Sequence, residues 1–557
     1  MVFSSRVFFE MIRIVMRRML KIIFLNFALF SFLTFTVQAQ KVENKLDQLA
    51  KEFQIYRDLA DKRVKAYQEK HNTARFRTNK NGVTYLLEDV TESGIPIYIK
   101  TFNDDVATDL NVKQLRTGGG LGLNLLGSGM KVGLWDGGRV RGDHVELTGR
   151  VIQQDGFATL NDHATHVAGT IIASGIKAHA RGMAPEATLL AHEFSNDIIK
   201  MAALAKPDQT SLLFSNHSYG RIGGWDGGVW KGDPSISNSE DYSFGFYDGP
   251  TNQWDNLAFN APYYTIVKSA GNDRGESGGG PQPADGPYDC ITTIGNAKNI
   301  ITVGAVNKLV GPYVNSSSVS MSSFSSWGPT DDGRIKPDLV APGVDVESTF
   351  DASNSSYTFF SGTSMSSPAV TGSLVLLQQL YKNLNGGNVM RAATLKALAI
   401  HTAREAGANP GPDFSFGWGL LDAEAAAKVI TGKDDQNVFI TEASLSNGQT
   451  YEVELNPKAD EKITATLVWT DPAGTPVAAS LNPTTKMLVN DLDMRIAEDI
   501  TGGLTFFPWT LDPAPSKRGL AAVQTGDNFR DNVEKIELNN PLPRKYKLKI
   551  THKGASL

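Results

Sequence analysis

The stretch "FFSGTSMSSPAVTGSLVLL", Phe359–Leu377, places small hydroxyl residues and glycine directly before a run of apolar residues. The apolar run predicts a buried helix, and serine and threonine are common at helix N-termini. A second interpretation is that one hydroxyl, that of Ser364, is a nucleophile held at the start of this helix. Pro368 fits a helix start, because proline is tolerated in the first turn. The rest of the sequence has to decide between the two interpretations.

Composition places the 557-residue chain among globular proteins of more than one domain, with 41% hydrophobic and 20% charged residues. The formal net charge of −5 provides no basic surface, so we expect no nucleic-acid partner. Cys290 is the only cysteine, and its surroundings, "GPYDCITTIG", contain no base. We therefore expect Cys290 to be a small buried hydrophobe and not a nucleophile.

The N-terminus has the order of a secretory signal peptide, which we assign to residues 1–39. Basic residues precede the apolar run "IIFLNFALFSFLTFTV", and "VQA" ends it with small residues. The apolar run is short for a membrane span. We expect a secreted or cell-surface protein without stable membrane insertion after cleavage, and a monomer.

Residues 40–115 form an N-terminal extension or a propeptide. A charged segment with helical spacing, residues 44–72, is followed by the strand-like runs "GVTYLLEDV" and "GIPIYIKTFN". Residues 116–430 repeat a pattern of short apolar strand, loop and helix. This pattern predicts an α/β domain with a parallel sheet covered by helices on both faces. Residues 437–557 lose the helical periodicity and predict an all-β sandwich or jelly roll.

Two further motifs could complete a site around Ser364. Asp136 ends the buried run "KVGLWD", a position at which open α/β sheets bind ligands, and His163 begins a helix in "NDHATHVAGTIIASG". A nucleophilic serine needs a base, and the base needs an orienting carboxylate, so we take His163 and Asp136 for these roles. Read alone, Asp136 could be a strand-end cap and His163 a satisfied core histidine. His163 and His166 do not have the H-E-x-x-H spacing of a zinc site.

Asn272 adds a fourth element in "VKSAGNDRG", at the end of another apolar strand. Its side-chain amide could donate to an oxyanion, and the N–H of Ser364 at the helix start could be the second donor. The order Asp136, His163, Asn272, Ser364 favours the nucleophile interpretation.

The sequence is similar to the subtilisin-like serine proteases over roughly residues 116–430. The segments "GLWDGG", "HATHVAGT", "SAGN" and "SGTSMSSPAVTG" carry the resemblance, with "RIKPDLVAPG" and "FGWGLLDAEAA" in support. The chain order Asp, His, Ser is the one known for subtilisin itself. The resemblance implies Asp136, His163 and Ser364 as the catalytic residues and Asn272 as an oxyanion donor. It further implies polypeptide substrates, and it makes Ser218, Tyr219 and Gly220 in "SNHSYGRIGGW" one wall of the primary pocket.

The C-terminal segments "TLVWTDPAG" and "LVNDLDM" resemble the β-domain of the oxidatively stable alkaline branch of these proteases. The resemblance implies no cofactor for the chemistry and is compatible with a structural calcium ion, for which "NDLD" offers Asn490, Asp491 and Asp493. We assign no metal ligands. The alternative to a secreted serine endopeptidase is a catalytically silent surface adhesin on the same scaffold. The intact set of site residues argues against the adhesin.

Overall fold

The structure, a computed structural model, describes residue 45 and residues 48–78, 84–91, 93–101, 107–210, 212–433 and 437–555. The predicted signal peptide lies outside these residues. Within the described ranges, no helix combines the length and apolar character that a membrane span requires.

A seven-stranded parallel sheet forms the centre of the molecule. Its inner strands are buried along nearly their whole length, as expected for a sheet with both faces covered, whereas the short edge strand Val151–Gln153 is partly exposed. In spatial order the strands are β13 (Leu339–Pro342), β12 (Ile301–Val306), β11 (Thr265–Ser269), β7 (Phe214–His217), β4 (Lys131–Asp136), β6 (Thr188–Glu193) and β5 (Val151–Gln153).

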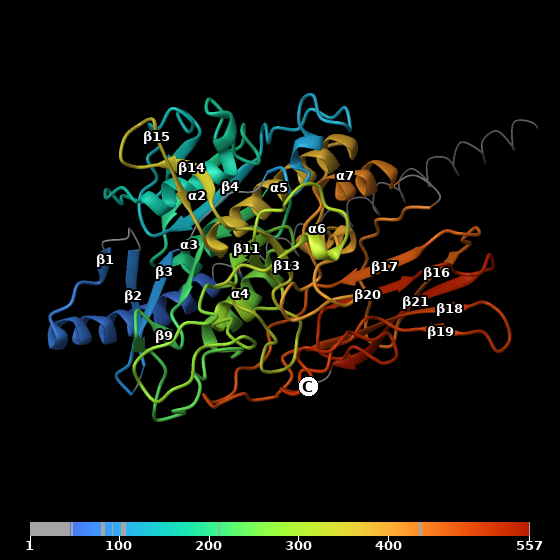
Figure 1. The fold of residues 1–557 in the computed structure, drawn as a ribbon. Helices are drawn as coiled ribbons and strands as arrows, with labels where there is room; N and C mark the ends of the chain where they lie inside the picture. The colour runs from blue at the N-terminus through green and yellow to red at the C-terminus, as the bar shows by residue number, and fades with distance from the viewer. Residues whose placement is uncertain are drawn as a thin grey trace, which may run out of the picture.

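Helices cover both faces of this sheet, which confirms the predicted fold class (Figure 1). One face packs against α2 (Asp162–Ile172), α5 (Thr363–Leu384), α6 (Ala392–Thr402) and α7 (Ala423–Gly432). The other packs against α3 (Asp197–Leu204) and α4 (Gly249–Asn260). Because side chains alternate along a strand, Leu134 of β4 enters the first core and Trp135 the second.

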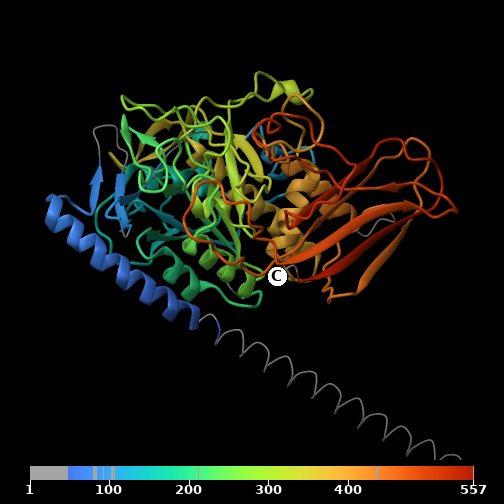
Figure 2. The ribbon, with the colours of Figure 1, turned by 90° about the horizontal axis from the view of Figure 1, so that it is seen from below.

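The N-terminal segment docks on the α/β domain as a helix and a small sheet. Residues 48–71 are helical, and Leu49 and Phe53 of this helix pack in the same core as Trp254. Figures 1 and 2 show the helix lying along one side of the α/β domain. The antiparallel sheet consists of β1 (Phe76–Thr78), β2 (Thr84–Val90), β3 (Pro96–Thr101) and β8 (Tyr219–Arg221). The sheet therefore joins the N-terminal segment to β8 of the α/β domain.

Two antiparallel hairpins complete the α/β domain. They are formed by β9 (Trp225–Asp226) with β10 (Val229–Trp230), and by β14 (Val346–Phe350) with β15 (Ser356–Phe360). The second hairpin leads directly into α5.

The C-terminal part is a β-sandwich, as predicted. One antiparallel sheet has the order β16 (Thr450–Leu455), β21 (Tyr546–Ala555), β18 (Asn490–Glu498) and β19 (Thr505–Phe506); the other pairs β17 (Ile463–Val468) with β20 (Val533–Leu538). Met494 of β18 and Ile536 of β20 share one core between the sheets. A buried ion pair of Lys298 with Asp471 fixes the sandwich to the α/β domain, on the side away from the N-terminal strands (Figures 1 and 2).

Candidate active site

Asp136 ends β4, and the glycines after it bring the chain close to the next helix. The carboxylate is fully buried, and its Oδ1 accepts the N–H of Gly137 at 2.7 Å. A Cβ on Gly138 would lie 2.8 Å from the Cβ of Asn161, so only glycine allows this approach. The turn thus places Asp136 beside the N-terminus of α2.

His163 is the second residue of α2 and contacts Asp136. Asn161 caps the helix, because its Oδ1 accepts the N–H of Ala164 at 2.8 Å. His163 Nδ1 lies 2.7 Å from Asp136 Oδ1, and both side chains are buried. A carboxylate at Nδ1 holds the proton on that nitrogen, which leaves Nε2 as the basic atom.

Ser364 is the second residue of α5, and two hydrogen bonds join it to Ser218. The Ser364 hydroxyl donates to the carbonyl of Ser218, and the Ser218 hydroxyl donates to the carbonyl of Ser364, each at 2.8 Å. Ser218 directly follows β7. The predicted nucleophile is therefore fixed at the carboxyl end of a central strand, where the sequence pattern placed Asp136 as well.

The position of Pro368 differs from the prediction. We expected it in the first helical turn, but α5 begins at Thr363, so Pro368 lies one turn further in. Proline has no N–H to donate to the carbonyl four residues earlier, which is that of Ser364. The Ser218 hydroxyl supplies a donor to that carbonyl instead, so a seemingly misplaced proline fits because of a distant serine.

Asn272 lies against the first residue of α5 with a fixed orientation. Its Oδ1 accepts the backbone N–H of Thr363 at 2.9 Å and the Thr363 hydroxyl at 2.8 Å. Since an amide N–H can only donate, the oxygen of Asn272 must be the atom that faces Thr363. The NH₂ group consequently points away from Thr363 and remains available as a donor.

Tyr219 and Gly220 line a pocket beside these residues, whereas the third predicted wall residue, Ser218, contacts Ser364. The pocket lies between β8 and the end of β11. It is lined by Tyr219, Gly220, Arg221, Lys268, Ser269, Ala270, Gly271, Asp273 and Thr292. Lys268 and Asp273 were missed by the sequence reasoning, although a lysine inside the apolar strand "TIVKS" was a detectable signal.

The strand that forms the pocket wall is already paired. Thr101, Lys100 and Ile99 of β3 lie opposite Tyr219, Gly220 and Arg221 in an antiparallel ladder. Ser364 has no exposed surface. The N-terminal segment thus occupies the edge of β8.

His166 and Cys290, which the sequence analysis did not assign to the site, make contacts with the surrounding structure. His166 Nε2 lies 3.3 Å from the carbonyl of Val346. The Cys290 sulfur is buried and accepts the N–H of Trp327 at 3.2 Å, and burial raises the pKa of the thiol to about 12. A thiol with this pKa is not a nucleophile near neutral pH, which agrees with the sequence-based interpretation.

A cluster of acidic residues in the β-sandwich includes Asp493, one of the residues that the sequence offers for calcium, but the cluster only partly suits a cation. Asp493 is one of three acidic residues, with Asp527 and Glu534, whose oxygens lie within 4.8 Å of one another. One oxygen of Glu534 is buried without a hydrogen-bond partner, which fits a cation ligand. However, Arg495 and Lys553 already form ion pairs with both aspartates. These residues neutralise part of the charge that a metal would need.

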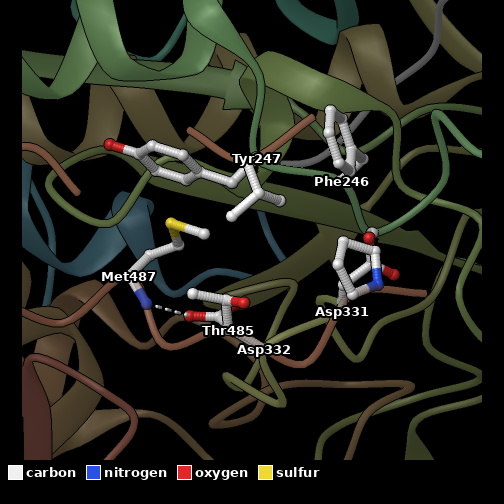
Figure 3. A pocket seen from close by; sticks show the side chains of 9 residues that line it. Phe246, Tyr247, Asp331, Asp332, Thr485 and Met487 are labelled. Carbon is white, nitrogen blue, oxygen red and sulfur yellow. Dashed lines mark hydrogen bonds between the residues drawn. The ribbon is translucent and has the colours of Figure 1, made fainter. Parts of the chain in front are cut away.

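A second cavity lies where the β-sandwich meets the α/β domain (Figure 3). Phe246, Tyr247 and Asp331 come from the α/β domain, and Met487 comes from the sandwich. The N–H of Met487 donates to Asp332 at 3.1 Å. Because both domains line this cavity, it lies at the domain interface, and none of the predicted site residues lines it.

Comparison with known proteins identifies the family. The model of the subtilase family matches residues 127–419, which is more than half of the chain. Subtilisin DY of Bacillus licheniformis is 27% identical over 317 residues, which cover 54% of this chain and 92% of that protein.

Two larger proteins match shorter segments. The serine protease/ABC transporter B family protein tagA of Dictyostelium discoideum is 31% identical over 221 residues, 33% of this chain and 12% of that protein. A C5a peptidase of Streptococcus pyogenes is 46% identical over 87 residues, 16% of this chain and 7% of that protein. The chain therefore spans only a small part of these two relatives. The family model and the parallel α/β fold show that the chain belongs to the subtilase family of subtilisin-like serine proteases.

Proposed function

We propose that the chain is an exported serine endopeptidase that uses Ser364, His163 and Asp136. Ser364 Oγ attacks the peptide carbonyl while His163 Nε2 takes its proton. The C–N bond then breaks, and His163 returns the proton to the leaving amine. Water attacks the resulting ester by the same route and regenerates Ser364. Asp136 orients the imidazole and stabilises its charged form.

The charge that develops on the carbonyl oxygen needs donors that are in place beforehand. The NH₂ group of Asn272 and the N–H of Ser364 at the start of α5 are suited to this role, and the helix dipole favours negative charge there. The contact of Asn272 with Thr363 supports this assignment, because it fixes the amide beside the helix start.

The observation that carries the proposal is the buried 2.7 Å contact between Asp136 and His163. We expect a fluorophosphonate probe to label Ser364, and Ser364→Ala or His163→Ala to lower peptidase turnover about a millionfold, the scale known for subtilisin itself. Absence of labelling in the folded protein would instead favour the silent adhesin. Secretion is tested separately, by the presence of the protein outside the cell with residues 1–39 removed.

We further propose that the N-terminal segment is a propeptide removed by the enzyme. The pairing of β3 with β8 supports this, since it blocks the strand edge at which a substrate would bind. Purified wild-type protein should lack the segment, whereas Ser364→Ala should retain it. Equal retention in both proteins, measured by intact mass, would make the segment a permanent extension.

A further inference from the structure

The pocket between β8 and β11 contains two cations and one carboxylate. Lys268 and Arg221 provide the cations, and Asp273 provides the carboxylate. The remaining lining residues are neutral. The pocket thus has an excess of positive charge, whereas the whole chain has a formal net charge of −5.

Lys268 is buried without an ion-pair partner. Its side chain is 3% exposed, and its Nζ donates to the backbone carbonyl of Tyr219. Among the described residues, no carboxylate lies within 4.0 Å of this ammonium group, unlike those of the buried Lys298 and Lys336. A buried charge without a counter-ion is costly, because a single neutral acceptor does not replace its hydration.

The acidic groups around Lys268 have other contacts. Asp197 accepts the Tyr219 hydroxyl at 2.6 Å and the N–H of Ile198. Asp273 Oδ2 lies 3.4 Å from the Ser326 hydroxyl. Both carboxylates therefore act on Lys268 from a distance, and neither neutralises it directly.

Arg221 is the second cation of the pocket, and within the described ranges it also lacks an ion-pair partner. Its guanidinium lies over the ring of Tyr242, 5.3 Å from the ring centroid. Asp241 and Asp248 favour its charged form from a distance, but among the described residues no carboxylate forms an ion pair with it. The two cations of the pocket thus both lack a direct counter-ion.

Gly220 keeps the path to Lys268 open. A Cβ at this position would lie 3.4 Å from Lys268 Nζ and 3.9 Å from Thr292 Oγ1. The absence of a side chain leaves this volume for a substrate group, which would reach the ammonium group between β8 and β11.

We propose that this pocket selects an acidic side chain, glutamate or aspartate, in the residue before the scissile bond, with Lys268 as its counter-ion. This inference rests on the proposed function and names the substrate class of the same site. A substrate carboxylate would supply the charge that the protein does not place beside Lys268.

The pH dependence follows from the state of Lys268. Burial lowers the pKa of Lys268 to about 8, against the opposing effects of Asp197 and Asp273. The facing His217 on β7 stays neutral, because burial holds its pKa well below the usual value, and Arg221 and Tyr219 complete the surroundings. Lys268 is charged below about pH 8 and loses its charge above it. Preference for an acidic residue should therefore decline as the pH rises through 8.

The test compares two peptide p-nitroanilides that differ only in glutamate or glutamine before the scissile bond. Active enzyme, as purified from the expressing cells, is counted by fluorophosphonate titration. At pH 7 we expect kcat/KM to be at least about tenfold higher for glutamate, since a charged hydrogen bond is stronger than a neutral one. The ratio should fall between pH 7 and pH 10. A ratio of one or less at pH 7, or a ratio independent of pH, would overturn the inference.

Lys268→Met isolates the ammonium group. The variant removes an unpaired buried charge and keeps the length of the side chain, so we expect it to fold. Its glutamate-to-glutamine ratio should fall to one or below, while Lys382→Met, at the end of α5, should keep the wild-type ratio. If Lys268→Met does not fold, the glutamate-to-glutamine ratio of the wild-type enzyme and the pH dependence of this ratio test the inference instead.

The outcomes separate this inference from the proposed function. Labelled enzyme that cleaves peptides but prefers glutamine overturns the acidic specificity alone. Enzyme that the probe does not label overturns the proposed function, and the specificity falls with it.

Discussion

Replacing Ser218 by alanine should destabilise the protein through two orphaned polar groups. The Ser218 hydroxyl donates to the carbonyl of Ser364, and it accepts a hydrogen bond from the side-chain amide of Asn216 at 2.9 Å. All three residues are fully buried, so water cannot replace the lost partner. Each buried group left unsatisfied costs about 1–3 kcal/mol, so for the two groups we expect a loss of about 2–6 kcal/mol in the free energy of unfolding.

The assay is urea unfolding in the Ser364→Ala background, which prevents self-digestion and keeps the backbone carbonyl at position 364. Pro368→Ala provides the critical comparison, because it restores an N–H that can donate to this carbonyl. In a double-mutant cycle, Ser218→Ala should therefore cost about 1–3 kcal/mol less when alanine occupies position 368. An equal cost in both backgrounds would refute the idea that the serine hydroxyl replaces the missing amide of the proline.

Four other predictions concern separate parts of the molecule. Asn272→Ala should lower kcat about a hundred- to a thousandfold, the scale known for subtilisin's own oxyanion donor, and a loss below tenfold in steady-state assays would mean that another group donates. Asp471→Ala should lower the free energy of unfolding by about 3–5 kcal/mol in urea titrations, because it leaves Lys298 buried without a counter-ion; a loss below 1 kcal/mol would contradict this. Cys290 should resist iodoacetamide at pH 8 in the folded protein and react in urea, since its pKa of about 12 keeps the thiol protonated; rapid alkylation of the native state, seen by mass spectrometry, would argue against this burial. If calcium stabilises the β-sandwich, removal of divalent cations by a chelator should lower the Tm by about 5 °C, and an unchanged Tm in calorimetry would exclude such a role.

Local pattern was sufficient to predict most of the fold. The strands β4, β6, β7, β11 and β12 are short apolar runs with helical segments between several of them, and such runs are typical of a covered parallel sheet. The edge strands β5 and β13 were not predicted. β5 has three residues, and β13 ends in a proline, so neither has enough length or periodicity to be recognised.

The residues of the pocket that we propose to recognise substrate were harder to predict from the sequence. Tyr219 and Gly220 were placed at the pocket by resemblance, but Lys268 was read only as part of a strand. A single lysine in an apolar run does not show whether its ammonium group reaches solvent, an ion-pair partner or a cavity. In this fold it reaches the pocket because β8 crosses the end of β11.

The sequence by itself determined the residue types that could carry the chemistry and the elements on which they lie, because strand and helix periodicity and helix caps are local properties. Only the tertiary structure decided that Ser218 replaces the missing amide of Pro368, that β3 occupies the edge of β8, and that Lys268 lacks a counter-ion. Ser218 and Ser364 are 146 positions apart. Which groups meet over such separations depends on how the elements pack, and the packing is set by all of their surfaces together and not by any one segment.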